Sequence, residues 1–242
     1  MRKPLFLKVA RRFPNYALTT AVEAAREPKK EGRKLPRWVL SWKHLSPLTA
    51  GIPWVSFEAF DYLEKFLADL DHRARIWEYG SGGSTVWFAQ HSESLDGVEH
   101  DPVWHALVTE RVKQKGISNC HIALIEQVDA EPPFVEGTHQ KITYGTSETR
   151  QRGDYSAYVK AIDHFDDEYF DLVVIDGRSR EACLIHAASK VRRGGAIYLD
   201  DADRPRYQST ISLFADWKQV SLGGIRPLSS PNRGLILIRP TL

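Results

Sequence analysis

A glycine-rich stretch is the first part of this sequence that could do chemistry. The segment WEYGSGGSTVWFA, residues 77–89, places Gly80, Ser81 and Gly82 between two apolar runs. These runs predict a strand followed by a helix, with the glycines at the turn between them. Such a turn leaves room for a ligand, and the first helical turn offers it free N–H groups. The alternative is that the glycines serve only the turn.

Two glutamates near this stretch favour the ligand hypothesis. Glu99 ends the predicted strand SLDGVEH and follows the loop by about twenty residues, where an acid can accept hydrogen bonds from both hydroxyls of a ribose. Glu78 lies two positions before the first glycine. A dinucleotide-binding loop needs a small residue at its sixth position, where this chain has Thr85. We therefore expect an adenosine ligand other than a dinucleotide.

Three aspartates form a second group. Asp176 ends the apolar run FDLVVID, and Asp200 and Asp201 end AIYLDD. The carboxyl ends of parallel strands lie at one edge of a sheet, so these carboxylates should be neighbours there. Together they could hold Mg²⁺, which would lower the pKa of an acceptor hydroxyl. Without a metal, Asp176 or Asp200 is the candidate base; the alternative is a surface ion network.

Strand and helix patterns alternate from residue 75 onward and predict a doubly wound α/β sheet. Ser56 is the expected N-cap of the first helix, and Gly194 and Gly195 are expected to close the last long one. The predicted strands are 75–79, 94–100, 120–126, 170–176, 196–201 and 234–240. The predicted helices are 57–70, 84–91, 102–115, 154–165 and 180–192, and 212–220 is a helix or a strand.

Four segments resemble, in order, the motifs of the class I S-adenosylmethionine (SAM)-dependent methyltransferases. They are EYGSGGST at 78–85, VEHDP at 98–102, FDLVVIDG at 170–177 and VRRGGAIYLDD at 191–201. The resemblance implies a mostly parallel, seven-stranded sheet with helices on both faces, and SAM as the cofactor. By this resemblance, Glu78 would hold the ammonium group of the cofactor, and the methionine part would lie against Gly80, Ser81 and Gly82. Glu99 would bind the ribose, His100 would lie beside the adenine, and Asp176 would be close to the cofactor.

The aspartates resemble those of metal-dependent O-methyltransferases, both catechol-type and bacterial sugar enzymes. The sugar enzymes have an acid-Gly after the fourth strand, then a further acid that is their candidate base. This chain has Arg178 at that position, and arginine cannot act as a base at neutral pH. It can instead neutralise the carboxylates or bind an anionic substrate.

The resulting hypothesis is a SAM-dependent methyltransferase that methylates an oxygen of a small molecule or sugar. One alternative is an NAD(P)-dependent oxidoreductase on a similar sheet, and another is a non-catalytic binding module with the same fold. A nucleic-acid methyltransferase is a third, without a matching Asn/Asp-Pro-Pro-Tyr/Phe motif.

The N-terminal part differs from the rest in charge. Residues 1–37 hold eleven Lys or Arg against three Glu, a net charge of +8, whereas the whole chain carries +2. We expect a basic N-terminal extension or cap over 1–53, with helical character, and a methyltransferase domain over 54–242. The arm could contact an anionic surface or another subunit, or lie solvated. Aromatic residues of GIPWVSF, 51–57, are candidates for an acceptor pocket or for the core, and the excursion 127–154 for a lid.

Cysteine content and hydropathy bear on the compartment. The two cysteines, Cys120 and Cys183, lie in apolar segments and are expected to be buried thiols rather than a disulfide framework. No apolar run is long enough to span a bilayer. These features favour a cytoplasmic protein without a transmembrane segment.

Overall fold

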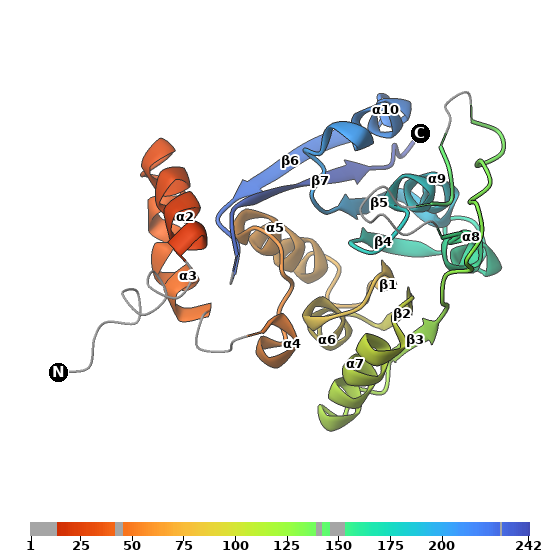
Figure 1. Cartoon of the computed structure of the whole chain (residues 1–242), viewed down its shortest axis with the longest axis horizontal. Helices are drawn as coiled ribbons and strands as arrows, with labels where there is room; N and C mark the ends of the chain where they lie inside the picture. The colour runs from red at the N-terminus through yellow and green to blue at the C-terminus, as the bar shows by residue number, and fades with distance from the viewer. Residues whose placement is uncertain (1–13, 42–45, 139–141, 146–152, 228) are drawn as a thin grey trace.

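The computed structural model describes residues 14–41, 46–138, 142–145, 153–227 and 229–242. Seven strands form one sheet in the order β3-β2-β1-β4-β5-β7-β6 (Figure 1). β1 to β5 pair in parallel, and β7 runs antiparallel to both of its neighbours, so the predicted mostly parallel sheet is confirmed. The strands are β1 Arg75–Tyr79, β2 Ser94–Glu99, β3 Cys120–Leu124, β4 Phe170–Ile175, β5 Val191–Leu199, β6 Lys218–Gly224 and β7 Asn232–Ile238.

Helices cover both faces of the sheet (Figure 1). On one face, Ile76 of β1 packs in the core beneath α5 and α6, and α7 joins them through a cluster around Val108. On the other face, Trp77 packs in the core beneath α8, α9 and α10. Successive residues of β1 thus belong to opposite cores, as the twofold period of a strand requires. These helices are α5 Phe57–Ala68, α6 Gly83–Gln90, α7 Pro102–Gln114, α8 Ser156–Lys160, α9 Arg180–Lys190 and α10 Gln208–Ile211.

Ser56 caps α5, as expected, by accepting a hydrogen bond from the N–H of Ala59 at 3.1 Å. The end of α9 differs from the prediction, because α9 ends at Lys190 and β5 begins at Val191. Gly194, with φ +72°, lies inside β5, beside the irregularity in its pairing with β4. These glycines therefore serve a bulge in a strand rather than a helix end.

Other boundaries also differ. The predicted helix 154–165 is divided into α8 and the 3₁₀ turn η2 Ala161–His164. The ambiguous segment 212–220 contains the 3₁₀ turn η4 Ser212–Phe214 and the start of β6. The remaining short elements are η1 Gly32–Lys34, α4 Pro47–Ala50 and η3 Pro205–Tyr207.

The N-terminal helices α2 Pro14–Arg26 and α3 Leu35–Ser41 pack beside the β6–β7 end of the sheet (Figure 1). Trp38 is fully buried and donates its indole N–H to the carbonyl of Ser229 at 3.3 Å. The buried carboxylate of Glu31 accepts the backbone N–H of Ile225 at 2.9 Å. These contacts fix the described part of the extension to the sheet.

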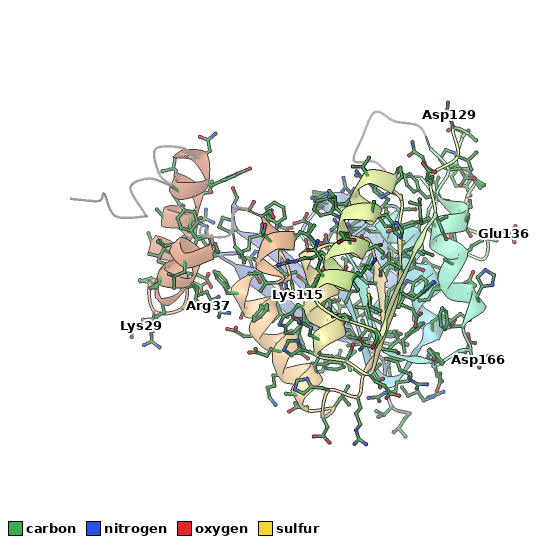
Figure 2. The ribbon with its side chains drawn as sticks, turned by 90° about the horizontal axis from the view of Figure 1, so that it is seen from below. Lys29, Arg37, Lys115, Asp129, Glu136 and Asp166 are labelled. Carbon is green, nitrogen blue, oxygen red and sulfur yellow. The ribbon has the colours of Figure 1, made fainter. Side chains whose placement is uncertain are left out.

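Several basic residues of the extension pair with the protein's own acids. Lys30 lies 2.9 Å from a carboxylate oxygen of Glu58, and Arg37 lies 2.7 Å from Asp61, both on α5. Arg37 lies on the side of the N-terminal helices that faces the sheet domain, whereas Lys29 points away from it (Figure 2). Part of the basic charge therefore serves to hold the extension in place. No helix among the described residues is long and apolar enough to cross a membrane.

Candidate functional site

The β1–α6 loop has two glycines with different roles. Gly80 has φ +86°, and a Cβ added there would lie 2.8 Å from Cα of Gly177, so the ends of β1 and β4 can touch only without a side chain. At Gly82 an added Cβ would meet nothing nearer than Ser84 Oγ and Trp104 Cζ2, both at 3.9 Å. The fold itself thus demands the first glycine, whereas the space beside the second is open.

A cavity of about 400 Å³ opens at this loop, at the carboxyl ends of β1, β2 and β4. Most of the predicted cofactor-binding residues line it, whereas Glu78 and Gly82 do not. The predicted residues in its wall are Gly80, Ser81, Glu99, His100 and Asp176, joined by Ser84, Trp104 and Arg178.

Glu99 is buried at the floor of this cavity, with 3% of its surface exposed. One carboxylate oxygen accepts the backbone N–H and the hydroxyl of Ser81, both at 2.9 Å. The other accepts the N–H groups of His100 at 2.8 Å and Asp101 at 3.0 Å. Burial alone would raise the pKa of Glu99, but the His100 side chain and the backbone N–H groups of Asp101 and Ser81 outweigh it and lower the pKa to about 2. Glu99 is therefore a fixed negative charge.

His100 lies between Glu99 and Arg178. The Arg178 Nε–H, which can only donate, lies 3.2 Å from His100 Nε2. His100 Nε2 must therefore accept, so the ring proton is on Nδ1, which faces a Glu99 oxygen at 2.8 Å. The ring of Tyr155 meets that of His100 edge-on at 5.8 Å. The imidazole is thus held in one tautomer and one orientation at the cavity wall.

Glu78 lies behind the cavity wall and is fully buried. Its two oxygens accept the hydroxyls of Ser84 and Thr85, each at 2.5 Å. Thr85 in turn accepts the backbone N–H of Gly82 at 2.8 Å. Burial raises the pKa of Glu78 to about 7, against the opposing effect of the two hydroxyls. Glu78 therefore braces the first turn of α6, with Ser84 between it and the cavity.

The three aspartates gather at the ends of β4 and β5, as predicted, but a guanidinium lies among them. Arg180 Nη2 is 2.8 Å from Asp176 Oδ1, and Nη1 is 3.9 Å from one oxygen each of Asp200 and Asp201. Within the described ranges, no group of three or more His, Cys, Asp or Glu residues is arranged to hold a metal ion. The predicted Mg²⁺ site is therefore not supported, because a fixed positive charge already lies among the carboxylates.

The two candidate bases differ in access. The Asp200 side chain is 3% exposed and accepts hydrogen bonds from Tyr198 at 2.8 Å and Asn232 at 2.9 Å. Burial and two nearby carboxylates raise its pKa well above the ordinary value. The Asp176 side chain is 37% exposed and lines the cavity, with Arg180 holding one of its oxygens. Only Asp176 of the two is placed to reach a ligand in the first cavity.

A second cavity, of about 190 Å³, adjoins the first at Asp176, which lines both. Five parts of the chain form it: α2, the segment before α5, the end of β4, the end of β5, and the β6–β7 connection. Its lining residues are Tyr16, Trp54, Asp176, Asp200, Asp201, Arg226 and Ser229. Of the aromatic residues of GIPWVSF, Trp54 lines this cavity and Phe57 is buried in a core cluster, so an acceptor pocket at this segment stays a prediction.

Some lining residues were missed by sequence reasoning. Ser84 and Trp104 follow the motif glycines and the motif acid, and a helical projection from those motifs could have found them. Tyr16, Arg226 and Ser229 lie far from any motif and carry no local signal. The candidate lid, 127–154, lies partly outside the described residues.

Sequence comparison and structural comparison give different results for this chain. No protein-family model and no curated protein sequence matches it. Several solved structures, however, are similar to it. An O-methyltransferase from Bacillus cereus in complex with S-adenosylhomocysteine (SAH) is 15% identical, with a TM-score of 0.55, over 80% of this chain and 86% of that one.

Two further structures are similar to the same extent. The O-methyltransferase TomG from Streptomyces achromogenes, in complex with SAM, is 17% identical over 73% of this chain and 78% of that one, with a TM-score of 0.51. An rRNA methylase from Streptococcus thermophilus is 11% identical over 78% of this chain and 99% of that one, with a TM-score of 0.51. The chain therefore has the Rossmann-like fold of the class I SAM-dependent methyltransferases, as its sequence motifs predicted.

Proposed function

We propose that the protein is a SAM-dependent methyltransferase that methylates an oxygen of a small molecule. One observation carries the proposal: five residues predicted from separate motifs, Gly80, Ser81, Glu99, His100 and Asp176, line a single cavity at the carboxyl edge of the sheet. Ligands of open α/β sheets bind at that edge, and all three reported neighbours with this fold are methyltransferases.

The cavity suits an adenosine cofactor. The open space beside Gly82 is bordered by Ser84 and Trp104, which both line the cavity, so the missing side chain leaves an extended ligand room near the backbone. Glu99 stays ionised at neutral pH and can accept ribose hydroxyls once the Ser81 hydroxyl turns away. His100, fixed in one tautomer, would border the adenine. When bound, SAM supplies a methyl group on a cationic sulfonium, which is open to in-line displacement.

Asp176 is the residue that we assign to the acceptor. Its carboxylate lines both cavities, so an acceptor hydroxyl in the second cavity can donate its proton to Asp176 while its oxygen faces the first. Arg180 donates hydrogen bonds to one carboxylate oxygen of Asp176 at 2.8 Å and to the Asp176 carbonyl at 2.9 Å. These two bonds fix the orientation of the Asp176 carboxylate. Asp200 lines the second cavity but not the first, and its side chain is only 3% exposed, so we assign it to the support of this edge rather than to proton transfer.

The position of Thr85 argues against the alternative of an NAD(P)-dependent oxidoreductase. A dinucleotide loop needs a small residue where this chain has Thr85, and Thr85 is fully buried, tying Glu78 to the N–H of Gly82. The loop is thus built around a hydroxyl that the dinucleotide pattern lacks. Measurement of catalytic turnover would distinguish an enzyme from a non-catalytic binding module.

Three expectations stay predictions: the cytoplasmic location, the division of the chain into 1–53 and 54–242, and contact of the basic arm with an anionic surface or another subunit.

Titration calorimetry with SAH, followed by transfer of labelled methyl from SAM to a panel of hydroxyl compounds, tests the proposal. We expect SAH to bind the wild-type protein, and Asp176→Asn to bind SAH equally well while losing methyl transfer by about 10²-fold or more. Glu64→Gln, on the exposed face of α5, is the matched control and should change neither quantity. Absence of SAH binding by the wild type would refute the proposal.

A further inference from the structure

The N-terminal extension contributes to the wall of the second cavity, together with the sheet. Tyr16 comes from α2, and Trp54 from the segment that joins the extension to α5. Trp54 is held by its indole N–H, which donates to the carbonyl of Pro227 at 2.5 Å, yet 41% of its surface stays exposed. Tyr16 is 38% exposed. Two aromatic side chains thus offer apolar surface next to the carboxylates.

Each of the three carboxylates in this wall faces an arginine, and Arg180 lies 3.9 Å from Asp200. Asp176 pairs with Arg180 at 2.8 Å, and Asp201 pairs with Arg204 and lies 3.7 Å from Arg226. A ligand anion would meet these carboxylates, and a ligand cation would displace or face arginines that already have partners. Either would bury a charge without a complementary one, which is costly. Hydroxyl groups, in contrast, can donate to carboxylate oxygens that already carry one partner.

The size of the cavity limits the ligand. Pockets for drug-sized molecules are about 300–1,000 Å³, whereas this cavity is about 190 Å³. It has room for one ring. Since Asp176 is shared with the first cavity, a ring seated here presents one edge to the place where the cofactor's reactive end is proposed to lie.

We propose that this cavity binds a single uncharged ring that bears hydroxyl groups, with one face against Trp54 and one hydroxyl directed at Asp176. The chemistry is shared by a saturated ring such as a sugar and by a phenol such as catechol. The role of this ring as the acceptor of the methyl group rests on the proposed function, but the binding of the ring can be measured separately.

Saturation-transfer NMR on the full chain, with and without SAH, gives that measurement. The probes are glucose and catechol, which distinguish the two sources, and glucose 6-phosphate and glucosamine, which carry a charge. We expect glucose or catechol to bind, each charged sugar to bind about tenfold more weakly than the preferred neutral ring, and Trp54→Ala to weaken that ring by about tenfold. Trp54→Phe keeps an aromatic face and should retain most of the affinity.

The outcomes separate the two proposals. SAH affinity should be the same in Trp54→Ala as in the wild type, because Trp54 does not line the first cavity, and this also shows that the variant is folded. Binding of SAH without either neutral ring, equal or tighter binding of a charged sugar, or unchanged ring affinity in Trp54→Ala would overturn the inference alone. Ring binding without SAH binding would uphold the cavity assignment and overturn the proposed function.

Discussion

Glu99 provides the sharpest test of the electrostatics at the cavity floor. The donors of Ser81, His100 and Asp101 converge on its two carboxylate oxygens. In a Glu99→Gln variant the side chain keeps its shape but has one oxygen and one NH₂ group. The NH₂ group then faces N–H or O–H donors, so part of this network is lost and the negative charge disappears.

The magnitude follows from the pKa. The pKa of Glu99 is about 2 in the folded protein and 4.5 in the absence of the fold. A gap of about 2.5 at about 1.4 kcal/mol per pKa unit makes the ionised carboxylate worth about 3 kcal/mol of folding free energy. Since the folded pKa is the lower one, this contribution is fully present above pH 4.5 and is lost as the pH falls toward 2. At pH 3 less than half of it, about 1.4 kcal/mol, remains.

Urea unfolding of the wild type and of Glu99→Gln at pH 7 and pH 3 measures this contribution. We expect Glu99→Gln to lower the free energy of unfolding by about 3 kcal/mol at pH 7 and by about half of that or less at pH 3. Glu64→Gln, on an exposed face of α5, controls for the general effect of removing a carboxylate. A loss that is equal at the two pH values, or below about 1 kcal/mol at pH 7, would refute the claim that hydrogen bonds to a buried charge hold this corner.

Four further variants test other parts of the structure. Gly80→Ala should lower the free energy of unfolding in urea by about 1–3 kcal/mol, because φ at this residue is +86° and the new Cβ would lie 2.8 Å from Gly177. Gly82→Ala should leave that free energy unchanged, because no atom crowds the new Cβ. It should weaken the binding of SAH by about tenfold in calorimetry, because the Cβ takes up the open space beside the loop. Arg180→Met should cost about 3–5 kcal/mol of stability, because it leaves carboxylates without their guanidinium. Trp38→Ala should make the N-terminal extension a rapid target of limited proteolysis while SAH affinity is retained, since Trp38 lies outside both cavities.

The sequence predicted the five parallel strands well, because each contains a short apolar run and four of them, all but β3, lead into a motif. Strands buried on both faces, such as β4, carry this signal over their whole length. The end of α9 was predicted wrongly, because Gly194 and Gly195 carry the same residue types whether they close a helix or allow a bulge. Local composition does not distinguish these uses; the pairing of β5 with β4 does.

The sequence indicated that an arginine could neutralise the aspartates, but it did not show which arginine does so. Neutralisation of the aspartates by an arginine follows from charge alone, yet the sequence offers both Arg178 and Arg180. The residue between them, Ser179, has φ +50°, a left-handed backbone. With this turn between them, Arg178 reaches His100 at the first cavity, while Arg180 reaches Asp176. This choice depends on backbone geometry at one residue, which the residue types do not reveal.

The position of Arg180 among the three aspartates explains both why the predicted Mg²⁺ site there is not supported and why Asp176 is assigned as the base. Its guanidinium donates to the carbonyls of Gly177, Asp176 and Asp200, so it ties the ends of β4 and β5 together as well as meeting their carboxylates. A cation that moved in would have to displace these backbone bonds, each of which serves the fold. The same bonds hold Asp176 at the junction of the two cavities with part of its side chain exposed. One arginine therefore fills the place of a metal ion and fixes the carboxylate to which we assign the acceptor's proton.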